Sequence, residues 1–280
     1  MRTKFAFLGL VLAIGFSVSA CDIKAGADGS GFSMGIATGQ AADTWTRSYP
    51  VAAGGRLELI NVNGRIDAEP ASGAAIEVSA KRTAKASTDE GAKEVLASIE
   101  MREEVGENRV RVEVRPPRLS GFSGHEFRWT IKVPKGVHVD LRTINGGVHV
   151  TGLTGEVRAK TTNGGVTGKQ VASSIIDASA VNGGVDFELS QPLTGNEQIE
   201  LQTVNGGASL ALTADSKASI TGRAVNGGVR VADGLDIKRT GEEDSRRRLD
   251  GTLNGGGAKV NVHTVNGGVR FERAGSTKGT

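Results

Sequence analysis

Two carboxylates on one short stretch are the side chains best placed for joint chemistry. Asp186 and Glu188 are separated by one residue in a segment that alternates apolar and polar residues, so both should lie on the same face of a β-strand. Proteins that act on polysaccharides can use such paired acids, either directly or through calcium. The acids of this chain do not recur at one position of the repeat described below. The pattern therefore favours a solvated face with at most a weak cation contact.

The other groups with catalytic potential do not form a recognised pattern. The four histidines do not have the spacing of a helical zinc motif, and a single cysteine cannot complete a Cys/His site. The serines cannot be assigned to a Ser-His-Asp constellation. The Gly-Gly pairs lack the Lys-Ser/Thr sequence and the following helix of a phosphate-binding loop. We therefore predict no enzyme activity, no metal and no cofactor. The histidines are His125, His138, His149 and His263.

Cys21 is the residue with the clearest chemical role. It follows the tripeptide Val-Ser-Ala, a positively charged start with Arg2 and Lys4, and an apolar run over residues 5–16 that is too short to span a bilayer. This order resembles the lipobox of bacterial lipoproteins, in which the leader is cleaved before the cysteine and the new N-terminal cysteine is acylated. The resemblance implies that residues 1–20 are a signal peptide and that Cys21 carries palmitate. The alternative is an ordinary secretory peptide and a free thiol.

The segment after Cys21 bears on the location of the protein. Asp22 resembles the signal that keeps lipoproteins of enteric bacteria in the inner membrane, and the outer membrane is the alternative. Residues 21–44 are rich in Gly, Ala and Ser and lack periodicity, which predicts a flexible tether. The chain has 34 basic and 31 acidic residues, so its near balance argues against a nucleic-acid partner.

An Asn-Gly-Gly repeat dominates the rest of the chain. Copies recur at intervals of about 20 residues, with an irregular one at Asn254 and a degenerate one at Asn63-Gly64. Apolar residues flank each copy with period 2, as Val139 and Leu141 do before the turn and Val148 and Val150 after it. This alternation predicts strands with one buried face on both sides of a turn. The turn residues are Asn63, Gly64, Asn145, Gly146, Gly147, Asn163, Gly164, Gly165, Asn182, Gly183, Gly184, Asn205, Gly206, Gly207, Asn226, Gly227, Gly228, Asn266, Gly267 and Gly268.

Two architectures satisfy this pattern. Each Asn-Gly-Gly could close an antiparallel hairpin, or it could form a corner of a coil whose strands stack in parallel. The regular period favours the coil, because stacking at about 4.8 Å places valine on valine and lets asparagine side chains form a hydrogen-bonded ladder. We therefore predict an all-β, parallel β-solenoid over residues 45–275, followed by a tail at 276–280.

Two segments interrupt the repeat. Residues 75–140 predict irregular rungs and an N-terminal cap that includes a short helix, with Ser87 and Glu90 as a capping box. Residues 236–251 form a charged insertion, in which Arg248 and Asp250 occupy slots that the repeat reserves for buried residues. The insertion predicts an excursion from the core.

The sequence Thr-Val-Asn-Gly-Gly-Val at this period, after a lipoprotein leader and a Leu-Glu-Leu-x-Asn-Val-Asn-Gly opening, resembles the bacterial "putative adhesin" domain family over residues 50–275. The resemblance implies a β-solenoid envelope protein with a non-catalytic, adhesin-like binding or scaffold role. Its expected partners are the membrane, through Cys21, and an envelope protein or surface polysaccharide. The alternatives are a regulatory component of envelope stress and a β-helix enzyme acting on polysaccharide. The aromatic content of 4% disfavours the enzyme, because sugar clefts need stacking rings.

Overall fold

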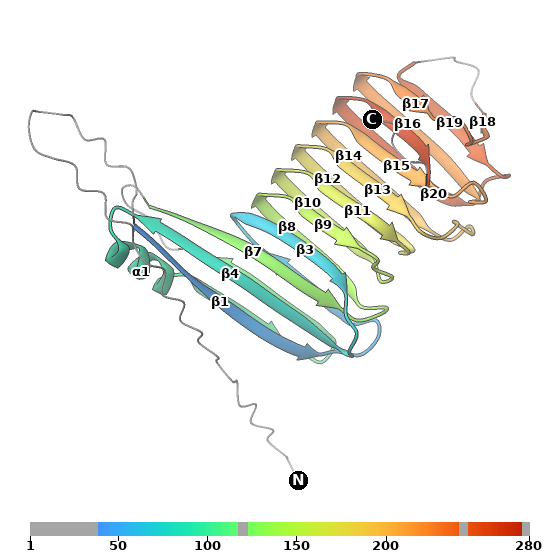
Figure 1. The fold of residues 1–280 in the computed structure, drawn as a ribbon. Coiled ribbons are helices and arrows are strands. Elements are labelled where there is room, and N and C mark those ends of the chain that lie inside the picture. Colours follow the sequence, from blue (N-terminus) through green and yellow to red (C-terminus); the bar gives the residue numbers. More distant parts are fainter. Residues whose placement is uncertain (1–38, 117–122, 241–245, 276–280) are drawn as a thin grey trace, which may run out of the picture.

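The computed structural model describes residues 39–116, 123–240 and 246–275, which form two β-sheets and one α-helix (Figure 1). Sheet A contains, from edge to edge, β1 (Gly39–Pro50), β4 (Ala75–Ala86), β7 (Gly124–Val133), β3 (Gly64–Pro70), β9 (Val148–Thr151), β11 (Val166–Val171), β13 (Val185–Leu189), β15 (Ala208–Leu212), β21 (Val269–Arg273) and β17 (Val229–Val231). Sheet B contains β18 (Ile237–Arg239), β19 (Arg248–Leu253), β16 (Ala218–Asn226), β20 (Ala258–Asn266), β14 (Gln198–Asn205), β12 (Ile175–Asn182), β10 (Val157–Asn163), β8 (His138–Asn145), β2 (Arg56–Ile60), β6 (Arg109–Arg115) and β5 (Glu100–Val105).

The repeat builds a stack of rungs, where a rung is a strand of sheet B, an Asn-Gly-Gly turn and a strand of sheet A. Neighbouring rungs pair in parallel and in register, so Val157 lies opposite both Val139 and Ile176. Side chains alternate along each strand, and the inward set is buried between the two sheets. The stacking of like residues that the period predicts is therefore present in these rungs.

Antiparallel strands at both ends make the two sheets mixed. β1, β4 and β7 pair antiparallel in sheet A, as do β5 and β6 in sheet B. At the other end, β19 runs antiparallel to both β16 and β18. The all-β class is confirmed, whereas the prediction of a purely parallel β-solenoid is not, because a stack of rungs leaves bare strand edges that the chain covers by turning back.

The rungs do not stack in sequence order. The last rung, β20–β21, lies between β14–β15 and β16–β17. At the other end, β2–β3 lies between β6–β7 and β8–β9. Each terminal rung is therefore formed by an internal segment of the chain, and a segment nearer the terminus is inserted behind it. In sheet A, β4 and β1 continue beyond the terminal strand β7.

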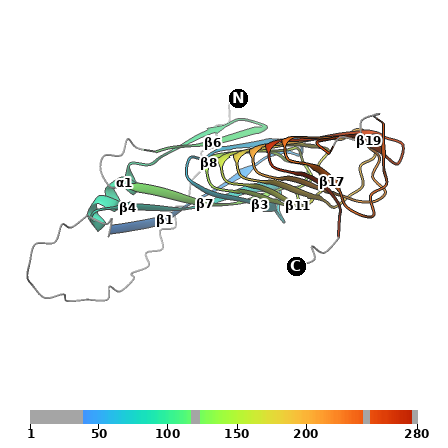
Figure 2. The same ribbon diagram turned by 90° about the horizontal axis from the view of Figure 1, so that it is seen from above.

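The N-terminal cap contains the helix α1 (Asp89–Ala97), which packs against β1 and β4 at the end of the longest strands (Figure 2). Thr88 is its N-cap, and the Thr88 Oγ1 accepts the N–H of Gly91 at 3.1 Å. The predicted helix is thus present, but Thr88 caps it in place of the expected Ser87–Glu90 box. Residues 39–44, predicted to be tether, belong to β1.

The charged insertion is part of the fold and not an excursion from it. β18 and β19 extend sheet B, and Leu249 and Leu253 are each 1% exposed. Arg248 and Asp250 point outward and form an ion pair. The repeat template misassigned the inward positions because β19 runs antiparallel to its neighbour, which removes it from the register of the parallel rungs. Residues 241–245 of the insertion lie outside the described residues.

Candidate binding edge and groove

The Asn-Gly-Gly turns form one straight edge of the molecule, hereafter the NGG edge, and close contact between rungs requires their first glycine. Gly164 has a φ of 150°, and a Cβ on it would lie 2.1 Å from the carbonyl oxygen of Gly146 in the next rung. Buried threonines two residues before the asparagines hold these carbonyls. Thr161 Oγ1, for example, donates to the Gly146 carbonyl at 2.8 Å. The turn is therefore fixed by contacts between rungs as well as by its own conformation.

The asparagines themselves form a continuous ladder along the edge. Six hydrogen bonds of 2.6–2.8 Å connect the Nδ2 of one asparagine to the Oδ1 of the next. In spatial order the ladder runs through Asn63, Asn145, Asn163, Asn182, Asn205, Asn266 and Asn226. None of the ladder asparagines adopts left-handed backbone angles. Asn254, in the irregular copy of the repeat, does. Their function in the structure is the ladder.

A ridge of exposed aliphatic side chains runs beside this ladder on sheet B. Four of the five large hydrophobic side chains exposed in the described residues occupy one position, directly before the ladder asparagine. We call them the aliphatic ridge, which consists of Ile144, Val181, Val204 and Val225, each 40–49% exposed. Thr162 and Val265 fill the same position in the remaining two complete rungs. Alternation along the strands places this position outward, so the exposure of the ridge could be recognised in the sequence.

A row without acids flanks the ridge, three residues before each ladder asparagine. It contains Arg142, Lys160, Ser179, Gln202, His263 and Arg223. The acids stand one row farther from the edge, where Asp177 pairs with Lys160 at 2.9 Å. Arg223 makes no ion pair within the described ranges. The ridge therefore lies between a neutral amide ladder and a basic to neutral row.

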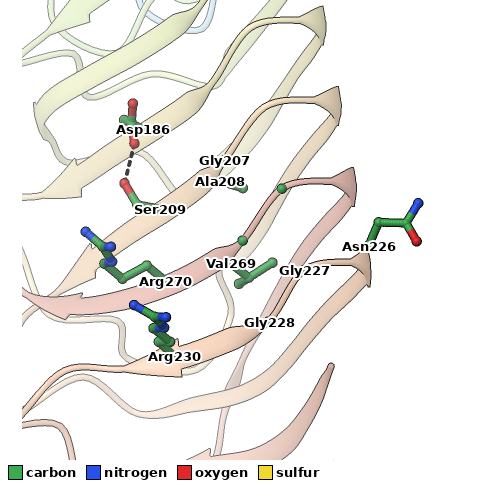
Figure 3. Close-up of a pocket in the computed structure, with 12 residues that line it drawn as sticks. Asp186, Gly207, Ala208, Ser209, Asn226, Gly227, Gly228, Arg230, Val269 and Arg270 are labelled. Carbon is green, nitrogen blue, oxygen red and sulfur yellow. Dashed lines mark hydrogen bonds between the residues drawn. The ribbon is translucent and has the colours of Figure 1, made fainter. Parts of the chain in front are cut away.

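On the sheet A side of the ladder, the second glycines leave a trough, which opens into a groove of about 550 Å³ at the C-terminal end (Figure 3). Gly207, Gly268 and Gly228 line its floor. Asp186, Ser209, Arg270 and Arg230 line its side, each four residues after a ladder asparagine and each opposite the next on neighbouring strands.

The acid and the arginines lie at different ends of this groove. Ser209 donates a short hydrogen bond to Asp186 (Figure 3). Arg270 reaches Glu272 on its own strand at 3.4 Å, and Arg230 has no ion-pair partner in the part of the chain that the structure describes. The groove thus combines a held carboxylate with two guanidinium groups, a set suited to binding an anion and not to proton transfer.

The acids and histidines singled out in the sequence do not assemble into one site. Glu188 accepts the Gly275 N–H at 3.3 Å, and no group of three His, Cys, Asp or Glu side chains gathers within the described ranges. His125 ends the asparagine ladder at 3.4 Å from Asn63, and burial lowers its pKa. His138 accepts the N–H of Glu156 at 2.9 Å. Cys21 lies outside the described residues, and no helix within them is long and apolar enough to cross a bilayer.

The comparisons with known proteins give the fold alone. No protein-family model and no curated protein matches the chain. The crystal structure of a putative cell adhesion protein from Clostridium sporogenes is similar, with a TM-score of 0.52 and 11% identity over 83% of this chain and all of the other. A putative adhesin from Bacteroides fragilis has a TM-score of 0.35 and 10% identity over 81% of this chain and 96% of the other.

Proposed function

We propose that the protein is a lipid-anchored protein of the bacterial envelope, with a non-catalytic, adhesin-like role and a β-solenoid body. The aliphatic ridge carries this proposal, because scattered exposed valines would be unremarkable, whereas a row of them at one repeat position marks a contact surface. The similar Clostridium sporogenes structure is named a putative cell adhesion protein, which is consistent with a binding role.

The shape of the ridge favours an elongated partner. Six stacked rungs at the usual strand spacing give a contact line of about 24 Å, only one side chain wide. Such a strip buries too little area for a stable protein dimer, which needs on the order of 800 Å² per partner. An extended envelope polysaccharide or an extended segment of an envelope protein can follow it, placing apolar groups on the ridge and an acidic group toward Arg223. Arg142 and Lys160 in the same row are already paired with Asp140 and Asp177.

The asparagine ladder and the glycine contacts make this surface rigid before binding. A preformed surface loses less conformational entropy on association than a flexible loop would. Lipidation of Cys21 would hold the body close to the bilayer, since the chain between Cys21 and Gly39 can extend at most about 60 Å. Asp22 favours the inner membrane, with the outer membrane as the other destination.

The ridge is tested with the lipidated protein in nanodiscs, titrated with polysaccharide and protein fractions from isolated envelopes. The double variant Val181→Thr/Val204→Thr keeps side-chain shape and strand propensity but makes the ridge polar. We expect it to weaken binding at least tenfold, because two apolar contacts of about 1 kcal/mol each are removed. The matched control is Val105→Thr, since Val105 is 62% exposed but lies on β5, away from the ridge.

Equal affinities for both variants and the natural protein would overturn the role of the ridge. The anchor is tested separately by palmitate labelling and membrane fractionation. Cys21→Ala should remove the label and release the protein from membranes without changing its affinity for the envelope fraction. A protein that stays labelled would contradict acylation at Cys21.

A further inference from the structure

We propose that the groove at the C-terminal end of the NGG edge binds an anionic group of the partner, a carboxylate, phosphate or sulfate, between Arg230 and Arg270. The inference rests on the proposed function only in placing the partner along the NGG edge. It adds the chemical class that this partner must carry.

The two arginines form a like-charge pair in which only Arg270 has an ion-pair partner among the described residues. They lie directly opposite each other on the parallel strands β17 and β21, where strand spacing is about 4.8 Å. Like charges in this relation destabilise a sheet, and a guanidinium group cannot lose its proton to relieve the repulsion. Arg230 has no ion pair among the residues described, and Arg270 has only the contact with Glu272 at 3.4 Å. A bound anion would supply the missing charge.

The groove has room for such a group because of the glycines beneath it. A side chain at Gly207, Gly228 or Gly268 would project into the trough. Because these glycines have none, the groove keeps a volume of about 550 Å³, which is that of a small-ligand site. Figure 3 shows the two arginine side chains next to each other, with Asp186 and Ser209 farther along the groove and Asn226 pointing away from it. The arginine end is therefore where an anion fits, and Asp186 excludes it from the other end.

The position is specific to this end of the stack. Four residues after the ladder asparagine, the earlier rungs carry His149, Thr167, Asp186 and Ser209. At this repeat position, two adjacent basic residues therefore occur only in the rungs of Asn266 and Asn226 among those described. Planar guanidinium groups bind carboxylate, phosphate and sulfate through paired N–H donors, whereas a neutral sugar offers no such partner. The geometry thus selects an acidic ligand.

The test is calorimetric titration of the lipidated protein, in nanodiscs of neutral lipid, with three named probes: polygalacturonate, polyphosphate and dextran. We expect both polyanions to bind and dextran not to bind at the groove. Arg230→Gln and Arg270→Gln should each weaken polyanion binding about tenfold and reduce its salt dependence, because each removes a charge-assisted contact. The stronger of the two polyanions identifies carboxylate or phosphate as the source.

Lys85→Gln is the matched control. Lys85 is exposed on β4 at the other end of the same sheet, lies opposite Gln40 and Gly124, and makes no ion pair within the described residues. If the control variant lost as much affinity as the groove variants, the effect would be one of net charge alone, and the proposal would be overturned. Unchanged binding by Arg230→Gln and Arg270→Gln would overturn it as well.

Asp186→Asn is an independent test. Removing the carboxylate should strengthen polyanion binding two- to fivefold, because the repulsion between Asp186 and the anion is lost. Weaker binding would contradict the placement of the anion at the arginine end of the groove. The ridge variant Val181→Thr/Val204→Thr should leave polyanion binding unchanged. Failure of the ridge variant to affect the envelope partner would therefore refute the proposed function alone, while failure of the arginine variants refutes only the anion site.

Discussion

At the scale of single residues, Glu197 shows how a surface carboxylate can matter for stability. Its carboxylate accepts hydrogen bonds from the N–H groups of Thr194 and Gly195 at 3.0 and 2.8 Å, and from the Thr194 hydroxyl at 2.7 Å. Burial alone would raise the pKa of Glu197, but the donors of Gly195 and Thr194 prevail and lower it from 4.5 to about 2. The ionised form is therefore the one that holds this loop before β14.

A lowered pKa predicts a pH-dependent contribution to folding. Because the folded state binds the Glu197 proton more weakly than the unfolded state, its stabilisation is complete above pH 4.5 and is lost as the pH falls toward 2. We expect Glu197→Gln to cost about 1 to 2 kcal/mol at pH 7 and about a quarter of that at pH 2.5. Urea unfolding at both pH values measures this, with Glu69→Gln as a control at an exposed strand position. A cost independent of pH would contradict the role of the charge.

At the scale of elements, large and small residues are matched between neighbouring rungs. A Cβ at Gly168 would lie 2.2 Å from the Phe187 ring of the next rung, and one at Gly222 would lie 2.9 Å from Phe271. These glycines break the apolar pattern of their own strands because a ring of the neighbouring rung takes the space. Phe187 lies opposite Gly168 on the next strand of the same sheet, whereas Phe271 faces Gly222 from the other sheet. Whether a residue fits the repeat thus depends on which rung lies beside it.

The asparagine ladder predicts that an internal rung is worth more than a terminal one. Asn182 makes two ladder hydrogen bonds, with Asn163 and Asn205, whereas Asn226 makes one, with Asn266. At about 1 kcal/mol per bond, Asn182→Ala should lower the free energy of unfolding by about 2 kcal/mol and Asn226→Ala by about 1. Urea unfolding compares them. Equal losses would mean that the ladder contributes no more than the intrinsic turn preference of asparagine.

At the scale of the whole molecule, the sequence predicts the rungs but not their order. The period, the alternation and the glycines of each turn are local properties, so the strands around Asn145 to Asn226 follow from them. The insertion of β20–β21 behind β16–β17 does not, because every rung offers nearly the same edge to its neighbours. Antiparallel pairing of β19 likewise depends on a chain reversal with no period to reveal it.

The candidate site is likewise predicted by the sequence only in part. The aliphatic ridge could be predicted from the sequence, since Val181 and Val204 sit at outward positions of an alternating strand. The Arg230–Arg270 pair follows from stacking the rungs at Asn226 and Asn266 next to each other, since both arginines stand four residues after the turn asparagine. The order of the groove residues does not, because the inserted last rung places Arg270, and not Arg230, beside Ser209.

This inserted rung predicts an unusual order of local opening. In a sequentially stacked repeat the rung nearest the C-terminus frays first, because it has one neighbour. Here β20 pairs with β14 on one side and β16 on the other, so it cannot open without exposing β16. Hydrogen exchange of the intact protein should therefore show slower exchange at Val260 and Val262 of β20 than in β17, despite their later place in the chain. Faster exchange over residues 258–273 than over 218–231 would contradict this stacking order.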